Sequence, residues 1–115
     1  MQEMKLHPYK TSGGKDLIMD YIDKLDVNER IDGLSVLQKL KNNDFDSLTI
    51  KTWQGKVLEV YFYKHNRIFY VVPDEQNIYL LHACRKQKNK TEQTDKDKVI
   101  KRAKELGEIL SKKFI

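Results

Sequence analysis

The sequence predicts a small α+β domain, and three observations carry this prediction. Residues 53–90 read as three short strands joined by tight turns. Upstream of them, apolar residues recur at helical spacing in two consecutive segments, and a third such stripe follows near the carboxyl end. A chain of 115 residues has room for one hydrophobic core, so we expect a single domain over residues 1–115.

The amino-terminal part is expected to form one strand and two helices. Residues 3–9 read as a short strand, in which Pro8 favours a sheet edge or a strand end. Residues 17–25 carry the first helical stripe, and Asp26 with Glu29 resembles a capping box that opens the second helix. The short link predicts a roughly antiparallel helical hairpin. The core face of the second helix is expected to contain Ile31, Leu34, Leu37 and Leu40.

The carboxyl-terminal part predicts an antiparallel β-meander followed by a helix. We expect strands near residues 56–63, 67–73 and 77–84, because linkers this short require hairpins. Residues 48–52 are ambiguous between a loop and a further short strand. The last helix is predicted within residues 94–110. The order of elements favours a fold in which the helices pack against one face of the sheet.

Side-chain alternation predicts a charged sheet face. Glu59 and Tyr61 point to the same side of their strand. A three-residue loop that pairs Tyr63 with Arg67 places Arg67 on this side, and a second three-residue loop adds Arg85. A slip of one residue in either hairpin would reverse the assignment. The opposite face is expected to hold the core residues Leu58, Val60, Phe62, Ile68, Tyr70 and Val72, together with a buried His82.

Charge is unevenly placed along the chain. The formal net charge is +5, with 22 Lys and Arg against 17 Asp and Glu. Residues 85–90 are basic without an acid, whereas residues 16–32 are rich in acids. A basic surface of this kind favours anionic partners such as nucleic acid, although a merely soluble basic protein has the same composition.

Several classes of site have no support in the sequence. Cys84 is the single cysteine, so it cannot form an internal disulfide, and it reads as a small buried hydrophobe. His7, His65 and His82 are far apart without metal-ligand spacing, and we expect no metal and no cofactor. Neither a membrane-spanning run nor a signal peptide is recognisable, which predicts a cytoplasmic protein.

The charged face could support RNA cleavage without a metal. That reaction needs a base for the 2′-hydroxyl, stabilisation of the phosphorane charge and an acid for the leaving oxygen. Arg67 and Arg85 are candidates for the charge stabilisation, and we expect Arg67 to pack against nothing that the fold needs. Glu59 is the candidate general base, with an ordinary exposed strand glutamate as the alternative.

Further candidates could bind the RNA chain. Lys86, Lys88 and Lys90 are expected to contact phosphates, with a solvated basic loop as the alternative. Tyr61 and Tyr63 could stack on unpaired bases.

The ordered motifs resemble those of a toxin family. WQGKVLEVYF at residues 53–62, NRIFY at 66–70 and IYLLHACRKQKNKT at 78–91 resemble the RelE/ParE toxin superfamily, and its HigB branch with phage-derived members most of all. Those proteins tend to read W-x-L-R-F, x-R-I-x-Y and L-L-H-x-F-x-K-K-x-x-K-T in this order. The resemblance implies a RelE-like microbial RNase fold. It also implies a type II toxin that cuts mRNA on the ribosome, as a metal-independent endoribonuclease that inhibits translation.

The resemblance also implies which residues act. Arg67 matches the arginine before the I-x-Y strand, and Arg85 and Lys86 match the basic pair after the last strand. Glu59 matches an acidic residue of the phage-derived members. Tyr61 stands where the family usually has a basic residue, which shifts weight to the lysines from residue 86 onward.

The implied partner is a HigA-like helix-turn-helix antitoxin, commonly in a heterotetramer, with the ribosome and mRNA as targets. Operator DNA would be reached only through the antitoxin, and no membrane is involved. The acidic segment 16–32 is the expected antitoxin contact. Two alternatives remain: a ParE-like toxin that acts on a topoisomerase, and a non-catalytic RNA-binding protein.

Overall fold

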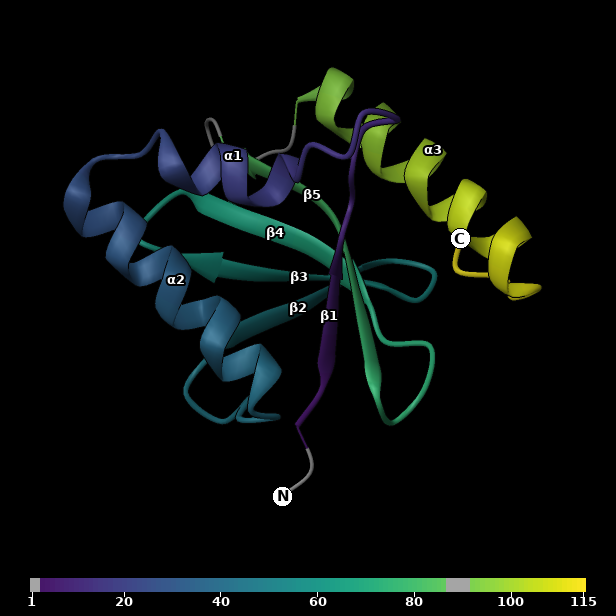
Figure 1. Ribbon diagram of the computed structural model, residues 1–115, viewed down its shortest axis with the longest axis horizontal. Coiled ribbons are helices and arrows are strands. Elements are labelled where there is room, and N and C mark those ends of the chain that lie inside the picture. Colours follow the sequence, from purple (N-terminus) through teal and green to yellow (C-terminus); the bar gives the residue numbers. More distant parts are fainter. Residues whose placement is uncertain (1–2, 87–91) are drawn as a thin grey trace.

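A computed structural model describes residues 3–86 and 92–115 and shows the predicted α+β fold (Figure 1). No helix in the described ranges combines the length and apolar character that crossing a membrane requires. The elements in chain order are β1 (Lys5–Pro8), α1 (Leu17–Asp23), α2 (Val27–Lys41), β2 (Thr49–Gln54), β3 (Val57–Phe62), β4 (Asn66–Val71), β5 (Asn77–Arg85) and α3 (Gln93–Leu110).

The sheet has five strands in the order β1-β5-β4-β3-β2. Strands β2 to β5 form the antiparallel meander, and β1 pairs with β5 in parallel. Pro8 is the last residue of β1, an edge strand, where its missing N–H costs no ladder hydrogen bond. The ambiguous segment around residues 48–52 is a strand, and it forms the other edge of the sheet as β2.

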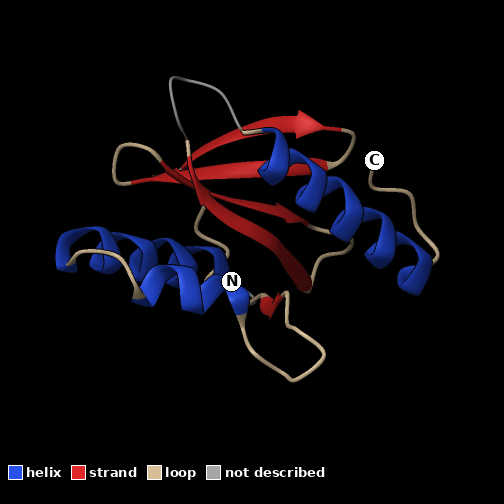
Figure 2. Cartoon of the chain, turned by 90° about the horizontal axis from the view of Figure 1, so that it is seen from above, coloured by secondary structure: helices blue, strands red, loops and turns tan. Residues whose placement is uncertain are grey.

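Helices cover both faces of the sheet, so the prediction of helices on one face is wrong. Figure 2 shows α3 across the sheet from α1 and α2. The cause lies in β3 to β5, which carry apolar residues on both sides and therefore need two covers. The core beneath α1 and α2 includes Ile18, Ile22, Val36, Leu40, Val60, Phe62, Ile68, Tyr70 and Leu80. The core beneath α3 includes Val57, Phe69, Val71, Leu81, Cys84, Val99, Ala103 and Phe114.

The inner face of α2 differs from the prediction at its first two positions. Ile31 and Leu34 are 59% and 42% exposed, whereas Gly33 faces the sheet. A Cβ at Gly33 would lie 3.0 Å from Cε2 of Phe62, so the glycine allows the helix to approach this ring closely. The predicted core residue Val72 is also exposed, because β4 ends before it. The residues that α2 buries are Glu29, Gly33, Val36 and Leu40.

Candidate functional site

The β3–β4 hairpin brings the predicted charged face together. Its loop has the expected length but occupies residues 63–65, so Tyr61 rather than Tyr63 pairs with Arg67. This shifts every pair by two residues, and a shift of two preserves the side-chain alternation. The prediction that Glu59, Tyr61 and Arg67 share a face is therefore confirmed. Tyr63 lies in the turn, with φ of 35° and 37% exposure.

The β4–β5 hairpin does not add Arg85 to this face, and that prediction is wrong. The register shifts within the pairing and leaves Leu81 without a partner in β4. This bulge reverses the alternation after Leu81, so Cys84 lies opposite Arg67. For the same reason His82 lies on the α3 side of the sheet, although it is buried as predicted.

Glu59 and Arg67 form an ion pair in the interior. Nη1 of Arg67 donates to Oε2 of Glu59 at 2.6 Å, and their side chains are only 2% and 7% exposed. The Arg67 guanidinium carbon also lies 5.2 Å and 5.6 Å from the ring centres of Tyr61 and Phe69. The expectation that Arg67 packs against nothing essential is therefore wrong.

Tyr61 connects this buried pair to the surface. Its hydroxyl donates to Oε1 of Glu59 at 3.0 Å and accepts a hydrogen bond from Nζ of Lys86 at 3.1 Å. The Lys86 ammonium also lies 5.2 Å from the centre of the Tyr61 ring. Both Tyr61 and Lys86 are half-buried. A chain of polar contacts thus runs from Lys86 at the surface through Tyr61 and Glu59 to Arg67.

Lys51 belongs to the same site and was missed in the sequence. It is exposed on β2, pairs with Glu59 in the register, and its ammonium lies 5.3 Å from the centre of the Tyr61 ring. Two lysines therefore lie against this ring, and a stacking base would compete with them. Side-chain alternation could have predicted that Lys51 lies at the site, but only if residues 48–52 had been assigned as a strand that pairs with β3.

Lys86 is the last described member of the basic run. Its backbone N–H donates to the carbonyl of His65 at 2.6 Å, so the β3–β4 turn fixes the point where the chain leaves β5. Lys88 and Lys90, the predicted phosphate contacts, lie outside the described residues. Lys86 is therefore the residue of the basic run whose contacts with the site are known.

Arg85 belongs to a different network on the α1 and α2 side. Its Nη2 donates to Oε1 of Glu29 at 2.7 Å, and Nδ2 of Asn66 donates to the same oxygen at 2.8 Å. The hydroxyl of Tyr21 donates to Oδ1 of Asn66, and burial raises the pKa of Tyr21 to about 12. Glu29 is thus used inside the fold, and Asp26 makes no capping hydrogen bond, so the predicted capping box is wrong.

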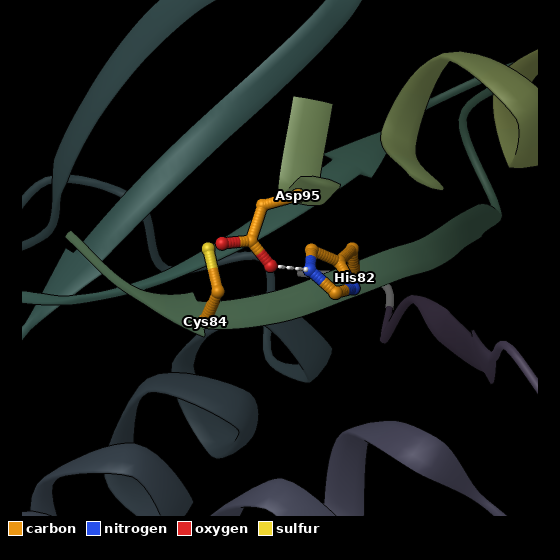
Figure 3. A group of neighbouring side chains, drawn as sticks. All are labelled: His82, Cys84 and Asp95. Atoms are coloured by element: carbon orange, nitrogen blue, oxygen red, sulfur yellow. Dashed lines mark hydrogen bonds and ion pairs between the residues drawn. The ribbon is translucent and has the colours of Figure 1, made fainter. Parts of the chain in front are cut away.

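Three potential metal ligands lie together under α3 among the described residues: His82, Cys84 and Asp95 (Figure 3). Arg102, which can only donate, lies 3.0 Å from Nδ1 of His82, so Nε2 carries the proton and donates to Asp95 at 2.7 Å. A metal would need the lone pair of that same Nε2. Burial lowers the pKa of His82 and raises that of the Cys84 thiol to about 12. These contacts describe a structural link between β5 and α3, in which a carboxylate accepts from the imidazole and burial disfavours the thiolate form of Cys84.

The comparison with known proteins identifies the family of this chain. No curated protein sequence matches it. The model of the family "Phage derived protein Gp49-like (DUF891)" matches residues 20–104, a span that holds the Glu59–Arg67 pair and its surface contacts. The chain therefore belongs to the phage-derived Gp49-like family, a family of RelE/HigB-like toxins.

Proposed function

We propose that this protein is the toxin of a type II toxin–antitoxin system and cleaves mRNA as a ribosome-dependent endoribonuclease. Membership in the Gp49-like family supports the toxin assignment. The observation that carries the nuclease assignment is the polar chain from Lys86 through Tyr61 to the buried Glu59–Arg67 pair. It combines a half-buried cation and hydroxyl with a buried carboxylate, which can supply the base and the charge stabilisation of metal-free transesterification.

The geometry suits a division of roles within this chain of contacts. Both carboxylate oxygens of Glu59 are already engaged, so Glu59 acts through Tyr61. The Tyr61 oxygen takes the proton of the 2′-hydroxyl while its own proton passes to Glu59. The 2′-oxygen then bonds to phosphorus, and the bond from phosphorus to the 5′-oxygen breaks as that oxygen takes a proton from water. The Lys86 ammonium stabilises the phosphorane charge. Arg67 holds Glu59 in place from below and is a positioning residue.

The remaining residues of the predicted site have binding or structural roles in this proposal. Lys88 and Lys90 follow Lys86 in the sequence, and we propose that they contact phosphates along the RNA. Tyr63 is exposed in the β3–β4 turn and is available for stacking. Arg85 contacts Glu29 on the other side of the sheet, so its main role is to hold that network.

One observation keeps the topoisomerase alternative open. A phosphate-binding cluster of Arg67, Arg85 and Lys86 would count against a ParE-like toxin, because a toxin that binds a protein target does not need one. In the structure Arg67 is buried and Arg85 lies on the opposite face, so Lys86 alone among the three is near the surface of the proposed site. The two hypotheses then differ in the damage that they predict: an endoribonuclease cuts mRNA, whereas a toxin that acts on a topoisomerase damages DNA.

Induction of the wild-type protein in bacteria is expected to arrest growth and to produce new mRNA 5′ ends in register with codons. The Tyr61→Phe variant, which removes only the hydroxyl, is expected to lose both effects while remaining folded, with a melting temperature lowered by the loss of one hydrogen bond to the buried Glu59. Arrest with DNA damage and no new 5′ ends would favour the ParE-like alternative. Bound mRNA without arrest or cuts would favour a non-catalytic RNA-binding protein.

We also propose a HigA-like helix-turn-helix antitoxin as partner, in a heterotetramer that reaches operator DNA through the antitoxin. The outer face of α2 supports this assignment. Val27, Ile31 and Leu34 are 56%, 59% and 42% exposed and follow each other at helical spacing, which forms an apolar stripe. Cytoplasmic location follows from this proposal, since mRNA, ribosomes and antitoxin meet there.

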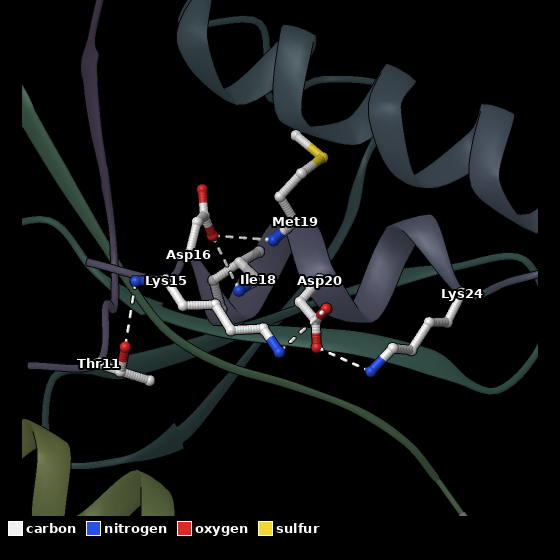
Figure 4. Close-up of polar contacts among 7 residues, drawn as sticks. All are labelled: Thr11, Lys15, Asp16, Ile18, Met19, Asp20 and Lys24. Carbon is white, nitrogen blue, oxygen red and sulfur yellow. Dashed lines mark hydrogen bonds and ion pairs between the residues drawn. The ribbon is translucent and has the colours of Figure 1, made fainter. Parts of the chain in front are cut away.

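Several acids of the segment 16–32, the expected antitoxin contact, already make hydrogen bonds or ion pairs within the protein. Figure 4 shows Asp16 accepting hydrogen bonds from the N–H groups of Ile18 and Met19, and Asp20 between Lys15 and Lys24. Asp32 accepts the N–H of Tyr63 at 2.7 Å. Within the acidic segment 16–32, the exposed Asp23 and Asp26 are left to meet basic antitoxin residues.

Ile31→Asp is expected to weaken antitoxin binding at least about tenfold, because it places a charge in the centre of an apolar contact. The mRNA cleavage of the variant should be unchanged, since α2 lies across the sheet from Lys86. The measurement is co-purification and titration with the helix-turn-helix protein encoded beside the toxin gene. Gln38→Asp, which adds the same charge at an exposed polar position of α2, is the control. Wild-type affinity of Ile31→Asp would move the interface elsewhere.

A further inference from the structure

Lys51 is a cation whose position the proposed chemistry does not use. It is exposed on the edge strand β2, and its ammonium lies against the Tyr61 ring at 5.3 Å. It makes no hydrogen bond to the Tyr61 hydroxyl, in contrast to Lys86, which donates to that oxygen. Lys51 is thus beside the reactive groups without being joined to them.

Positive charges outnumber negative charges around Tyr61. Lys51, Arg67 and Lys86 all lie within 5.3 Å of its ring centre, and Glu59 is the carboxylate in contact with the group. Arg67 already neutralises Glu59. Across residues 3–86 and 92–115, no carboxylate lies within ion-pair distance of Lys51 or Lys86. Two ammonium groups therefore share one ring and repel each other until an anion lies between them.

We infer that Lys51 and Lys86 form the two sides of a binding site for one phosphodiester group of single-stranded RNA. The inference rests on the proposed function and adds a phosphate ligand from β2 to it. The edge strand supplies this second charge, because the β2–β3 register places Lys51 opposite Glu59 and its ammonium lies against the Tyr61 ring.

RNA fits this site better than an acidic peptide does. Lys88 and Lys90 follow Lys86 in the sequence, so positive charge continues along the chain beyond the proposed site, which favours a polyanion such as RNA. A hydroxyl held between an ammonium and a carboxylate also lies beside the bound group, where a ribose 2′-hydroxyl would be placed. An acidic side chain would leave that hydroxyl without a substrate.

The test uses a short fluorescent oligouridylate in which every 2′-hydroxyl is methylated, so that it binds without being cut. Fluorescence anisotropy at a series of salt concentrations gives the salt dependence of affinity. Lys51→Ala is expected to weaken binding and to reduce the slope of log K against log salt by about 0.7, the loss of one phosphate contact on a single strand. Lys51→Arg should restore the slope. Lys56→Ala, an exposed lysine at the β2–β3 turn, should leave it unchanged.

The outcomes separate this inference from the proposed nuclease. A wild-type slope in the folded Lys51→Ala variant would overturn the inference, even if the protein cleaves mRNA. Competition by oligoglutamate as effective as that by oligouridylate would replace RNA with an acidic peptide as the ligand. A reduced slope in a protein that never cleaves mRNA would support the phosphate site and refute the nuclease. Melting curves exclude unfolding, which we do not expect because Lys51 is exposed.

Discussion

Replacing Arg67 with methionine is expected to lower the free energy of unfolding by about 3–5 kcal/mol, because the change leaves Glu59 buried without its charge partner. The two side chains are 2% and 7% exposed and joined at 2.6 Å. A domain of this size has a total stability of about 5–15 kcal/mol, so the single variant could lose much of its folded population.

The double variant provides the control for this prediction. Glu59→Leu with Arg67→Met replaces both charges by apolar groups, and we expect it to recover most of the lost stability. The surrounding rings of Tyr61 and Phe69 can pack against the new side chains. Urea unfolding of the wild type, both single variants and the double variant measures the coupling. Losses that simply add would show that the two charges do not depend on each other.

This energetic role changes how toxicity data on Arg67 have to be interpreted. An Arg67→Ala variant that no longer arrests growth could have lost its chemistry or its fold. The structure favours the second cause, since the Arg67 side chain is buried and forms an ion pair with the buried Glu59. A stability measurement must therefore accompany any activity measurement at this position.

The central group of the site could be predicted from local sequence because side-chain alternation is insensitive to one kind of error. The β3–β4 loop lies one residue earlier than expected, which moves each pairing by two positions. Glu59, Tyr61 and Arg67 therefore stay on one face. In the β4–β5 hairpin the pairing shifts by one residue, and a shift of one reverses the side-chain alternation. Its bulge adds a single extra residue at Leu81, which side-chain alternation does not predict, and this residue moved Arg85 to the other face.

One feature of the sequence indicates that the sheet is covered on both faces. It is an unbroken apolar run, which an analysis of side-chain alternation does not use. Strand β4 is buried along its whole length, and four of its six residues form the unbroken apolar run from Ile68 to Val71. A continuous apolar run is typical of a strand that is covered on both faces. Helical spacing in α2 could not show which side is inner, because Ile31 and Leu34 repeat like core residues. Gly33 and Glu29 decide it through contacts with Phe62, Asn66 and Arg85.

Lys86→Ala is expected to reduce the rate of ribosome-dependent mRNA cleavage by about a hundredfold or more, the usual effect of losing one donor to a developing negative charge. Its stability should stay within about 0.5 kcal/mol of the wild type, because the side chain is half-buried and its backbone contact to His65 remains. The measurement is single-turnover cleavage of a defined mRNA on programmed ribosomes, with urea unfolding in parallel.

Arg85→Ala is the matched comparison, because Arg85 and Lys86 are neighbours with the same charge that contact opposite sides of the sheet, Glu29 on one side and Tyr61 on the other. Its loss leaves the buried Glu29 without a cation, so we expect a stability loss of about 1–3 kcal/mol. The cleavage rate should fall far less than in Lys86→Ala, since no contact joins Arg85 to Tyr61 or Glu59 among the described residues. Equal losses of rate in two folded variants would contradict this division. The substrate would then cross the end of β5 and use both faces, and Arg85 would act on RNA as the family resemblance implies.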